Sequence, residues 1–295
     1  MSQLPAADAS GAGAPATPVS VPATPPAGVA TTAPSRALTT PPTTTVGAEP
    51  FATLMAHRTI RAYTDQPVGE EVMTALLDVA RHSATSSFLQ QTTIIRVLDP
   101  AVREQVHLAS GQPYVGGRRA ELLVLVADLH RNAVIRERAG VGLEPLERTN
   151  LFLTACQDTM IAAQSLVVAA ESLGLGTTYL GSILGDPQRV IAALGLPERT
   201  FPLVGLLVGH PAQEPQYKPR LPREITTAVD SYPELADHGE ALAAYDATVR
   251  EYYDLRDANR RVDSFTEQVA RTVGTGAAHR SPVLDVLHRQ RLCLT

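Results

Sequence analysis

Residues 151–173 read LFLTACQDTMIAAQSLVVAAESL, which is about six helical turns with apolar side chains on nearly every face. The polar residues Gln157, Asp158, Gln164 and Glu171 interrupt the roughly 20 consecutive apolar residues that a bilayer-spanning helix needs. The stretch therefore predicts a core helix and not a membrane span. A helix that is apolar all round must be covered on all sides, either in the domain centre or at a subunit interface.

Strands and further helices are expected on both sides of this core helix. Short β-branched or aliphatic runs predict strands at residues 92–98, 122–127, 177–180 and 201–208. Apolar residues at helical spacing predict helices at residues 70–82, 239–256, 265–273 and 282–290. The folded part of the chain is thus expected to mix helices and strands.

The N-terminal end of the chain differs from the rest in composition. The first fifty residues hold ten of the 23 prolines and twelve alanines, with only Asp8, Arg36 and Glu49 charged. Such a segment buries too little apolar surface to offset the entropy of ordering, so we expect residues 1–49 to be a disordered tail. Residues 50–295 have the length of one domain.

Charge and cysteine usage narrow the class of protein. The formal net charge is −5 and the pI is near 5.9, which argues against a nucleic-acid partner. Cys156 and Cys293 are too few for a disulfide scaffold or a metal knuckle. The N-terminus has no secretory or transit pattern and no lipid-anchor motif, so a cytoplasmic protein is expected.

The sequence contains none of the common motifs for a protein nucleophile or a metal site. The chain has no Gly-x-Ser-x-Gly, Cys-x-x-Cys, His-Glu-x-x-His or Walker-type phosphate loop. The run GLGTTY at residues 174–179 approaches a dinucleotide fingerprint, but it follows a helix instead of a strand. Anion-binding residues without a nucleophile suggest that a bound cofactor carries the chemistry.

Two basic clusters are candidate anion sites. The segment HRTIR at residues 57–61 gathers three cationic or potentially cationic side chains and one hydroxyl. In KPRLP at residues 218–222, prolines favour an extended chain, so Lys218 and Arg220 can point to one side and meet one phosphate. Taken alone, residues 57–61 could equally be a solvated turn, and proline-bracketed Lys218 and Arg220 are more often part of an ordinary loop.

A third candidate segment is rich in hydroxyl groups. Residues 85–90 read TSSFLQ, and these polar groups could bond a ring edge or a ribityl chain while Phe88 packs on a planar face. Serine and threonine are also common at helix ends, where they cap backbone N–H groups. Both interpretations stay open from composition alone.

Taken together, the motifs resemble those of one family. HRTIRxYTDxP (57–67), SSFLQ (86–90), AESLGLG (170–176), YLG (179–181) and KPRLP (218–222) are similar, in order and rough spacing, to the oxygen-insensitive NADPH nitroreductases and the related NADPH flavin reductases. The resemblance runs from about Phe51 to the C-terminus. Each motif is weak alone, but the combined set is highly specific.

The resemblance implies an α+β fold with a central mixed sheet flanked by helices, an intertwined homodimer, and one FMN in each of two clefts at the interface. It implies ribityl and phosphate ligands at His57, Arg58, Thr59, Arg61, Lys218 and Arg220. It further implies that the flavin and its chain are contacted by Thr85, Ser86, Gln112, Tyr179, Leu180 and Gly181. Phe88 would line the substrate side.

The C-terminal part, about residues 239–295, resembles the family's basic flap for NADPH. The run YYDLRDANRR at residues 252–261 supplies Arg256, Arg260 and Arg261, and Arg280 follows further on. Guanidinium groups on a flap suit the extra 2'-phosphate of NADPH. The same arginines could instead form the solvated face of a helix end.

The implied activity is hydride transfer from NADPH through flavin N5 to nitroaromatics, quinones or flavins, by a ping-pong mechanism and without a catalytic side chain or a metal. Alternatives are a free-flavin reductase that supplies a monooxygenase, or a flavin-binding protein without turnover. The last alternative is motivated by Ser182-Ile183-Leu184-Gly185, where the family usually has Gly-Leu-Arg-Asn. That departure puts the NADPH pose in more doubt than FMN binding.

Overall fold

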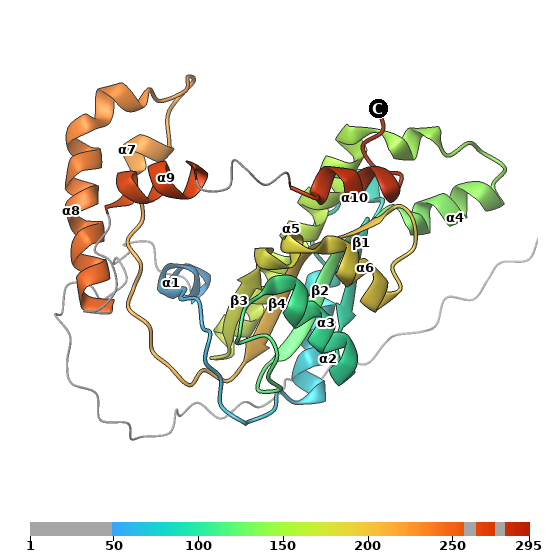
Figure 1. Cartoon of the computed structure of the whole chain (residues 1–295), viewed down its shortest axis with the longest axis horizontal. Helices are drawn as coiled ribbons and strands as arrows, with labels where there is room; N and C mark the ends of the chain where they lie inside the picture. The colour runs from blue at the N-terminus through green and yellow to red at the C-terminus, as the bar shows by residue number, and fades with distance from the viewer. Residues whose placement is uncertain (1–48, 257–263, 275–280) are drawn as a thin grey trace, which may run out of the picture. The chain divides into compact units, whose positions relative to one another are not determined.

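A computed structural model describes residues 49–256, 264–274 and 281–295 of the chain. It contains a four-stranded sheet in the order β1-β2-β4-β3 (Figure 1). The strands are β1 (Thr92–Arg96), β2 (Glu121–Asp128), β3 (Gly176–Leu180) and β4 (Thr200–Gly209). All four predicted strands are confirmed, with ends shifted by a few residues.

The strand directions differ from the mixed sheet that we expected. Every pairing of the named strands, β1 with β2, β2 with β4 and β3 with β4, is antiparallel. In the described part of the chain, parallel pairing is limited to an isolated bridge between Thr59 and Thr177, at the edge formed by β3. The mixed sheet that the family resemblance implied is therefore wrong for these strands, because each named strand runs opposite to every strand that it pairs with.

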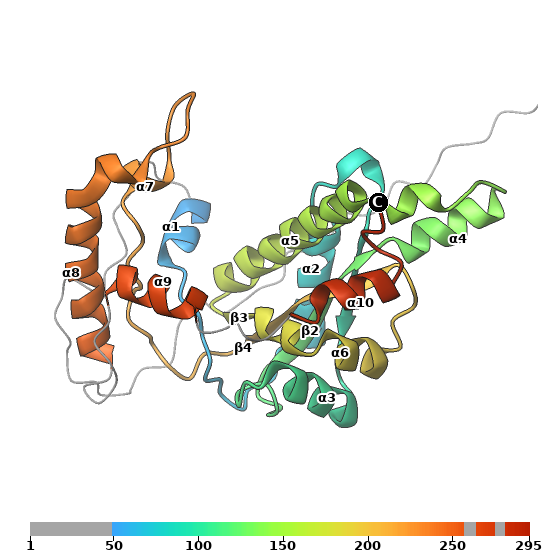
Figure 2. The same cartoon turned by 45° about the horizontal axis from the view of Figure 1, so that its top comes forward.

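Helices cover both faces of the sheet. The strand β2 is buried at every position after Glu121, and its side chains alternate between two hydrophobic clusters. Leu123 and Leu125 pack with α2 (Glu70–Arg81) and α5 (Thr149–Ser172), whereas Leu122 and Val124 pack with α3 (Pro100–Ser110) and α6 (Pro187–Leu194). Figure 2 shows these two pairs of helices on opposite sides of the sheet. Coverage on both faces explains why the sequence of β2 is apolar without alternation.

The helix α5 confirms the predicted core helix, but in one chain it is covered on one side only. By length and composition it could cross a membrane, yet its buried residues pack against the sheet and α2, as in the core of a folded domain. Its other side leaves three large apolar side chains exposed, Leu153, Met160 and Ile161. The sequence predicted that this helix is buried either in the domain centre or at a subunit interface. The exposed side of α5 is consistent with the second environment.

Other helices complete the described chain. Predicted helices are confirmed at α2, α8 (Gly239–Arg256), α9 (Phe265–Gly274) and α10 (Val283–Arg289). The helices that were not predicted are α1 (Glu49–Ala56), α3, α4 (His130–Arg138), α6 and α7 (Arg223–Thr226). Short 3-10 turns lie at η1 (Ser86–Phe88), η2 (Glu144–Glu147), η3 (Gly181–Gly185) and η4 (Leu235–His238). The expected tail falls almost wholly outside the described residues.

Candidate functional site

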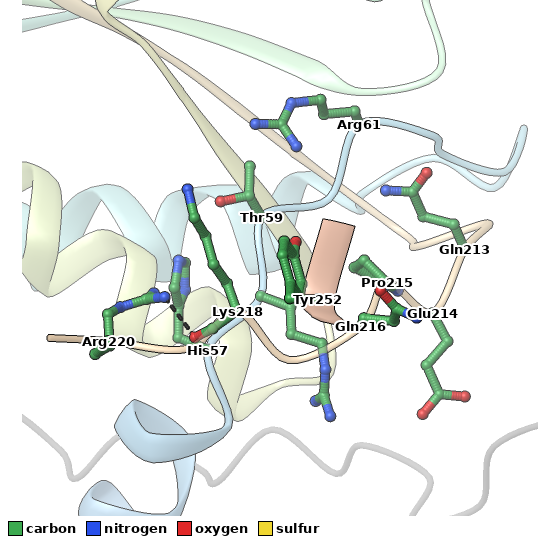
Figure 3. A pocket seen from close by; sticks show the side chains of 11 residues that line it. His57, Thr59, Arg61, Gln213, Glu214, Pro215, Gln216, Lys218, Arg220 and Tyr252 are labelled. Carbon is green, nitrogen blue, oxygen red and sulfur yellow. Dashed lines mark hydrogen bonds between the residues drawn. The ribbon is translucent and has the colours of Figure 1, made fainter. Parts of the chain in front are cut away.

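Both basic clusters line one cavity of about 430 Å³ (Figure 3). The walls come from the segment after α1, from the segment after β4, and from one residue of α8. The lining residues are His57, Arg58, Thr59, Arg61, Gln213, Glu214, Pro215, Gln216, Lys218, Arg220 and Tyr252. The structure therefore brings together all six residues that the sequence predicted as phosphate and ribityl ligands.

Backbone hydrogen bonds place the two segments side by side. The N–H of Thr64 donates to the carbonyl of His210, and the N–H of Ala212 donates to the carbonyl of Ala62, both at 2.9 Å. Tyr63 and Pro211 form an antiparallel bridge between the same segments. The segment that follows β4 therefore lies beside the segment that follows α1, and both segments line the cavity.

The segment after α1 is also attached to β3. The N–H of Ile60 donates to the carbonyl of Thr177 at 2.9 Å, and the hydroxyl of buried Tyr63 donates to the carbonyl of Ile60 at 2.7 Å. Burial raises the pKa of Tyr63 to about 12, so its hydroxyl keeps the proton that it donates. Gly176 lets the segment approach, because a Cβ there would lie 2.6 Å from Cγ1 of Ile60.

Positive charge dominates the cavity. Arg58, Arg61, Lys218 and Arg220 line it, while Glu214 is the carboxylate among the lining residues. Arg61 is exposed. Arg220 donates from Nη1 to the carbonyl of Lys218 at 2.7 Å (Figure 3). Such a set of cations with the Thr59 hydroxyl fits a dianionic phosphate and part of a ribityl chain.

The hydroxyl-rich segment does not join this cavity. Thr85 lines a different cavity, of about 340 Å³, with Asp158 and Arg131. The N–H of Ser86 donates to Oδ1 of buried Asp158 at 2.9 Å, which anchors the turn. Within one chain, Thr85, Ser86 and Phe88 are therefore not placed around the proposed phosphate ligands.

Backbone strain is concentrated in that turn. Ser87, Phe88 and Gln90 have φ values of 50°, 57° and 51°, which are uncommon for residues other than glycine. The Phe88 side chain is 82% exposed despite being apolar. A strained turn that presents an aromatic ring to solvent is typical of a binding element and not of a simple helix cap.

The remaining predicted flavin contacts also lie outside the lining of the cavity. Tyr179 directs its hydroxyl to Oε1 of Gln164 at 3.1 Å, and burial raises its pKa to about 12. Leu180 is buried in the core, Gly181 opens η3, and Gln112 follows α3. The Leu180 side chain is therefore not available to a ligand, whereas Tyr179 is half-buried at the end of β3.

Of the four arginines predicted to bind NADPH, only Arg256 lies within the described residues. Arg256 ends α8, and nothing is described of its side chain. Arg260, Arg261 and Arg280 lie outside the described residues. The part of the flap that is described is held together by Asp246, whose Oδ1 accepts from the N–H of Thr266 at 3.0 Å.

Sequence reasoning missed several residues of the cavity. Gln213, Glu214, Pro215 and Gln216 carry no pattern that distinguishes them from an ordinary loop. Tyr252 was predicted only as part of the flap, yet it is buried and lines the cavity from α8 (Figure 3). A described part of the flap therefore reaches the proposed cofactor site.

The fold and the cavity define a class of α+β protein with a cationic cavity beside the sheet. The nitroreductase family matches residues 54–210, and the C-terminal domain of that family matches residues 218–295. The chain belongs to the nitroreductase family.

Individual relatives agree with this assignment. An oxygen-insensitive NADPH nitroreductase of Salmonella typhimurium is 39% identical over 238 residues, covering 80% of this chain and 95% of the relative. An FMN reductase (NADPH) of Bacillus subtilis is 36% identical over 220 residues, covering 74% and 88%. The solved structure of the NfrA1 nitroreductase from Bacillus subtilis matches with a TM-score of 0.78 at 32% identity, covering 83% of this chain and all of that one.

Proposed function

We propose that the protein is an NADPH-dependent oxidoreductase that holds FMN in the cavity described above. The observation that carries the proposal is the convergence of two basic segments, distant in sequence, on one cavity in a member of the nitroreductase family. FMN, when bound, supplies the hydride-accepting and hydride-donating chemistry, which explains the lack of a nucleophile motif. The relatives named for NADPH and FMN support the same cofactors.

The residues of the chain hold and orient the cofactor. Arg58, Arg61, Lys218 and Arg220 neutralise the phosphate, and the hydroxyl of Thr59 adds a further donor. The backbone from Tyr179 to Gly181 borders the flavin ring. Stacking of the donor and acceptor on the ring provides proximity, which is the main acceleration that the protein itself supplies.

The site is completed, in this proposal, by a second copy of the chain. The exposed side of α5 and neighbouring residues of α1 and α2 form a mainly apolar groove of about 720 Å³, which includes Leu54, Val79 and Ile161. An intertwined homodimer would cover this groove and bring the turn with Thr85, Ser86 and Phe88 to the partner's cofactor. The exposure of Phe88 and the absence of this turn from the lining of the cationic cavity support this arrangement.

The electron acceptors are proposed to be small planar molecules, namely nitroaromatics, quinones or free flavin. One site that serves NADPH and then the acceptor gives ping-pong kinetics. Free-flavin reduction for a partner monooxygenase is the second candidate, favoured by the likeness to the FMN reductase of Bacillus subtilis. Steady-state rates with FMN, a nitrofuran and a quinone as acceptors separate the two candidates. We further propose a cytoplasmic location.

An absorbance spectrum of the purified protein, followed by NADPH without oxygen, tests the proposal. We expect a flavin spectrum that bleaches rapidly when NADPH is added. A protein without flavin would contradict the cofactor assignment. A flavin that NADPH does not bleach would favour the binding protein without turnover, and would direct attention to Ser182 and Leu184 in η3.

Donor selectivity gives one prediction. If Arg256 contacts the 2'-phosphate with a second guanidinium, NADPH should exceed NADH by about ten- to a hundred-fold in kcat/KM, corresponding to roughly 1.5 to 3 kcal/mol. Arg256→Ala should raise KM for NADPH while NADH use and FMN content stay nearly unchanged. Steady-state kinetics at low and high salt measure the effect, which screening should shrink. Equal use of both donors by the unaltered protein would refute this role.

Truncation gives a second prediction. Deleting residues 1–48 should leave FMN content, assembly and turnover unchanged, because this segment has no apolar periodicity and no matched motif. Flavin absorbance, light scattering and NADPH oxidation are compared between the full and shortened chains. A loss of flavin or of assembly on truncation would show that the tail is structural.

A further inference from the structure

The carboxylate of Glu171 connects the end of α5 with two segments around the cavity. Nδ1 of His57 lies 2.8 Å from Oε1 and 3.0 Å from Oε2 of Glu171. The hydroxyl of Thr177, in β3, donates to Oε1 at 2.6 Å. The Glu171 side chain is only 13% exposed, whereas His57 lines the cavity itself. Glu171 is absent from the lining of that cavity.

This contact determines which nitrogen of His57 faces a ligand. An ionised carboxylate only accepts hydrogen bonds, so Nδ1 of His57 must carry a proton in the pair. In the neutral ring the remaining nitrogen, Nε2, is then an acceptor. Two short contacts to one carboxylate also restrict rotation of the imidazole ring. Glu171 thereby sets both the tautomer and the orientation of a residue at the cavity wall.

We propose that Glu171 is a positioning residue for FMN, acting through His57. This inference rests on the proposed function, because it needs FMN in the cavity. When the ring is neutral and its Nδ1 proton is donated to Glu171, Nε2 accepts a hydrogen bond, and the matching group on the cofactor is a hydroxyl of the ribityl chain. Thr177 supports the carboxylate from β3, the strand that also receives the Ile60 backbone bond. Glu171 thus links the cofactor segment to the rigid sheet.

A double-mutant cycle tests the proposal. FMN dissociation is measured by diluting the flavin-loaded protein and following the rise in flavin fluorescence, for the wild type, Glu171→Gln, His57→Ala and the double variant. Glu171→Gln should raise the FMN Kd about ten-fold, which corresponds to the loss of about one charge-assisted hydrogen bond. The double variant should bind no more weakly than His57→Ala alone, because Glu171 acts through His57.

Two further variants separate positioning from general support. Thr177→Val keeps the carboxylate but removes one of its partners, so it should weaken FMN binding in the same direction by a smaller factor. Glu104→Gln removes the carboxylate beside His107, an exposed pair on α3, and should leave the FMN Kd unchanged. Nitrogen NMR of His57 should show the proton on Nδ1 in the wild type and a changed tautomer population in Glu171→Gln.

Specific results would overturn the proposal. An unchanged FMN Kd in Glu171→Gln would show that the pair does not matter for the cofactor. Additive losses in the double variant would show that Glu171 supports the fold without acting through His57. A wild-type protein that binds no FMN would instead refute the proposed function, which is a different outcome from either of these.

Discussion

Replacing Lys218 and Arg220 together with alanine should leave the purified protein colourless. Both side chains line the cationic cavity, and each charge-assisted bond to a phosphate contributes about 1.5 to 3 kcal/mol. Loss of both should therefore raise the FMN Kd by about two to four orders of magnitude. The ratio of flavin to protein absorbance after purification measures the effect. Arg61→Ala should act in the same direction with a smaller loss.

The matched control for this prediction is Arg223→Ala. Arg223 is exposed at the start of α7, shortly after Arg220 in the sequence, but it does not line the cavity. It should therefore keep its flavin, which separates a local contact from a general effect of net charge. Full FMN occupancy in both the double variant and Arg61→Ala would refute the phosphate site.

Ile161→Glu should prevent the proposed dimer from forming and leave a monomer at micromolar concentration. Ile161 is 45% exposed on α5 and lines the apolar groove between α1, α2 and α5. A carboxylate buried there by a second copy would have no partner, and its desolvation should raise the dimer Kd at least about a hundred-fold, or roughly 3 kcal/mol. Light scattering at several concentrations measures the assembly. Because we propose that the partner's turn completes the site, FMN should be lost together with the dimer.

Ile135→Glu provides the control for assembly. Ile135 is also an exposed isoleucine, on α4, but it lies outside the groove. The same change there should leave both mass and flavin content unaltered. A wild-type chain that is monomeric and still binds FMN would contradict the proposed assembly, and a monomeric Ile161→Glu that retains FMN would show that one chain suffices for the site.

Element types were predictable wherever the apolar pattern is long or strongly periodic. The sequence of β2 and that of α5 each indicated a buried element, and both are confirmed. The helices α3 and α6 were missed although each carries local end signals, since Asp99 and Asp186 cap their first turns and Gly111 and Gly195 follow their last. These signals mark only the ends, and α6, with eight residues, is too short for its apolar spacing to be distinguished from that of a strand or loop.

Strand direction and the covered side of α5 could not be predicted. The apolar runs indicated which strands are buried, but antiparallel pairing depends on how the intervening helices return the chain, which no run encodes. Similarly, residues 151–173 are apolar on nearly every face of the helix. The structure shows that a single chain covers only one of these faces. The sequence does not indicate whether the remaining apolar faces of α5 pack against the same chain or against a second copy.

By itself, the sequence determined the chemistry available for a site: two basic clusters, a hydroxyl-rich turn and no nucleophile motif. The family resemblance implied that His57, Arg58, Thr59 and Arg61 meet Lys218 and Arg220, and the tertiary structure places them in one cavity. Only the tertiary structure decided that Thr85 lines another cavity. The physical reason is that long-range bonds, such as those of Thr64 to His210 and Ile60 to Thr177, place these segments. Such bonds depend on packing of the whole sheet, whereas sequence patterns report only on near neighbours along the chain.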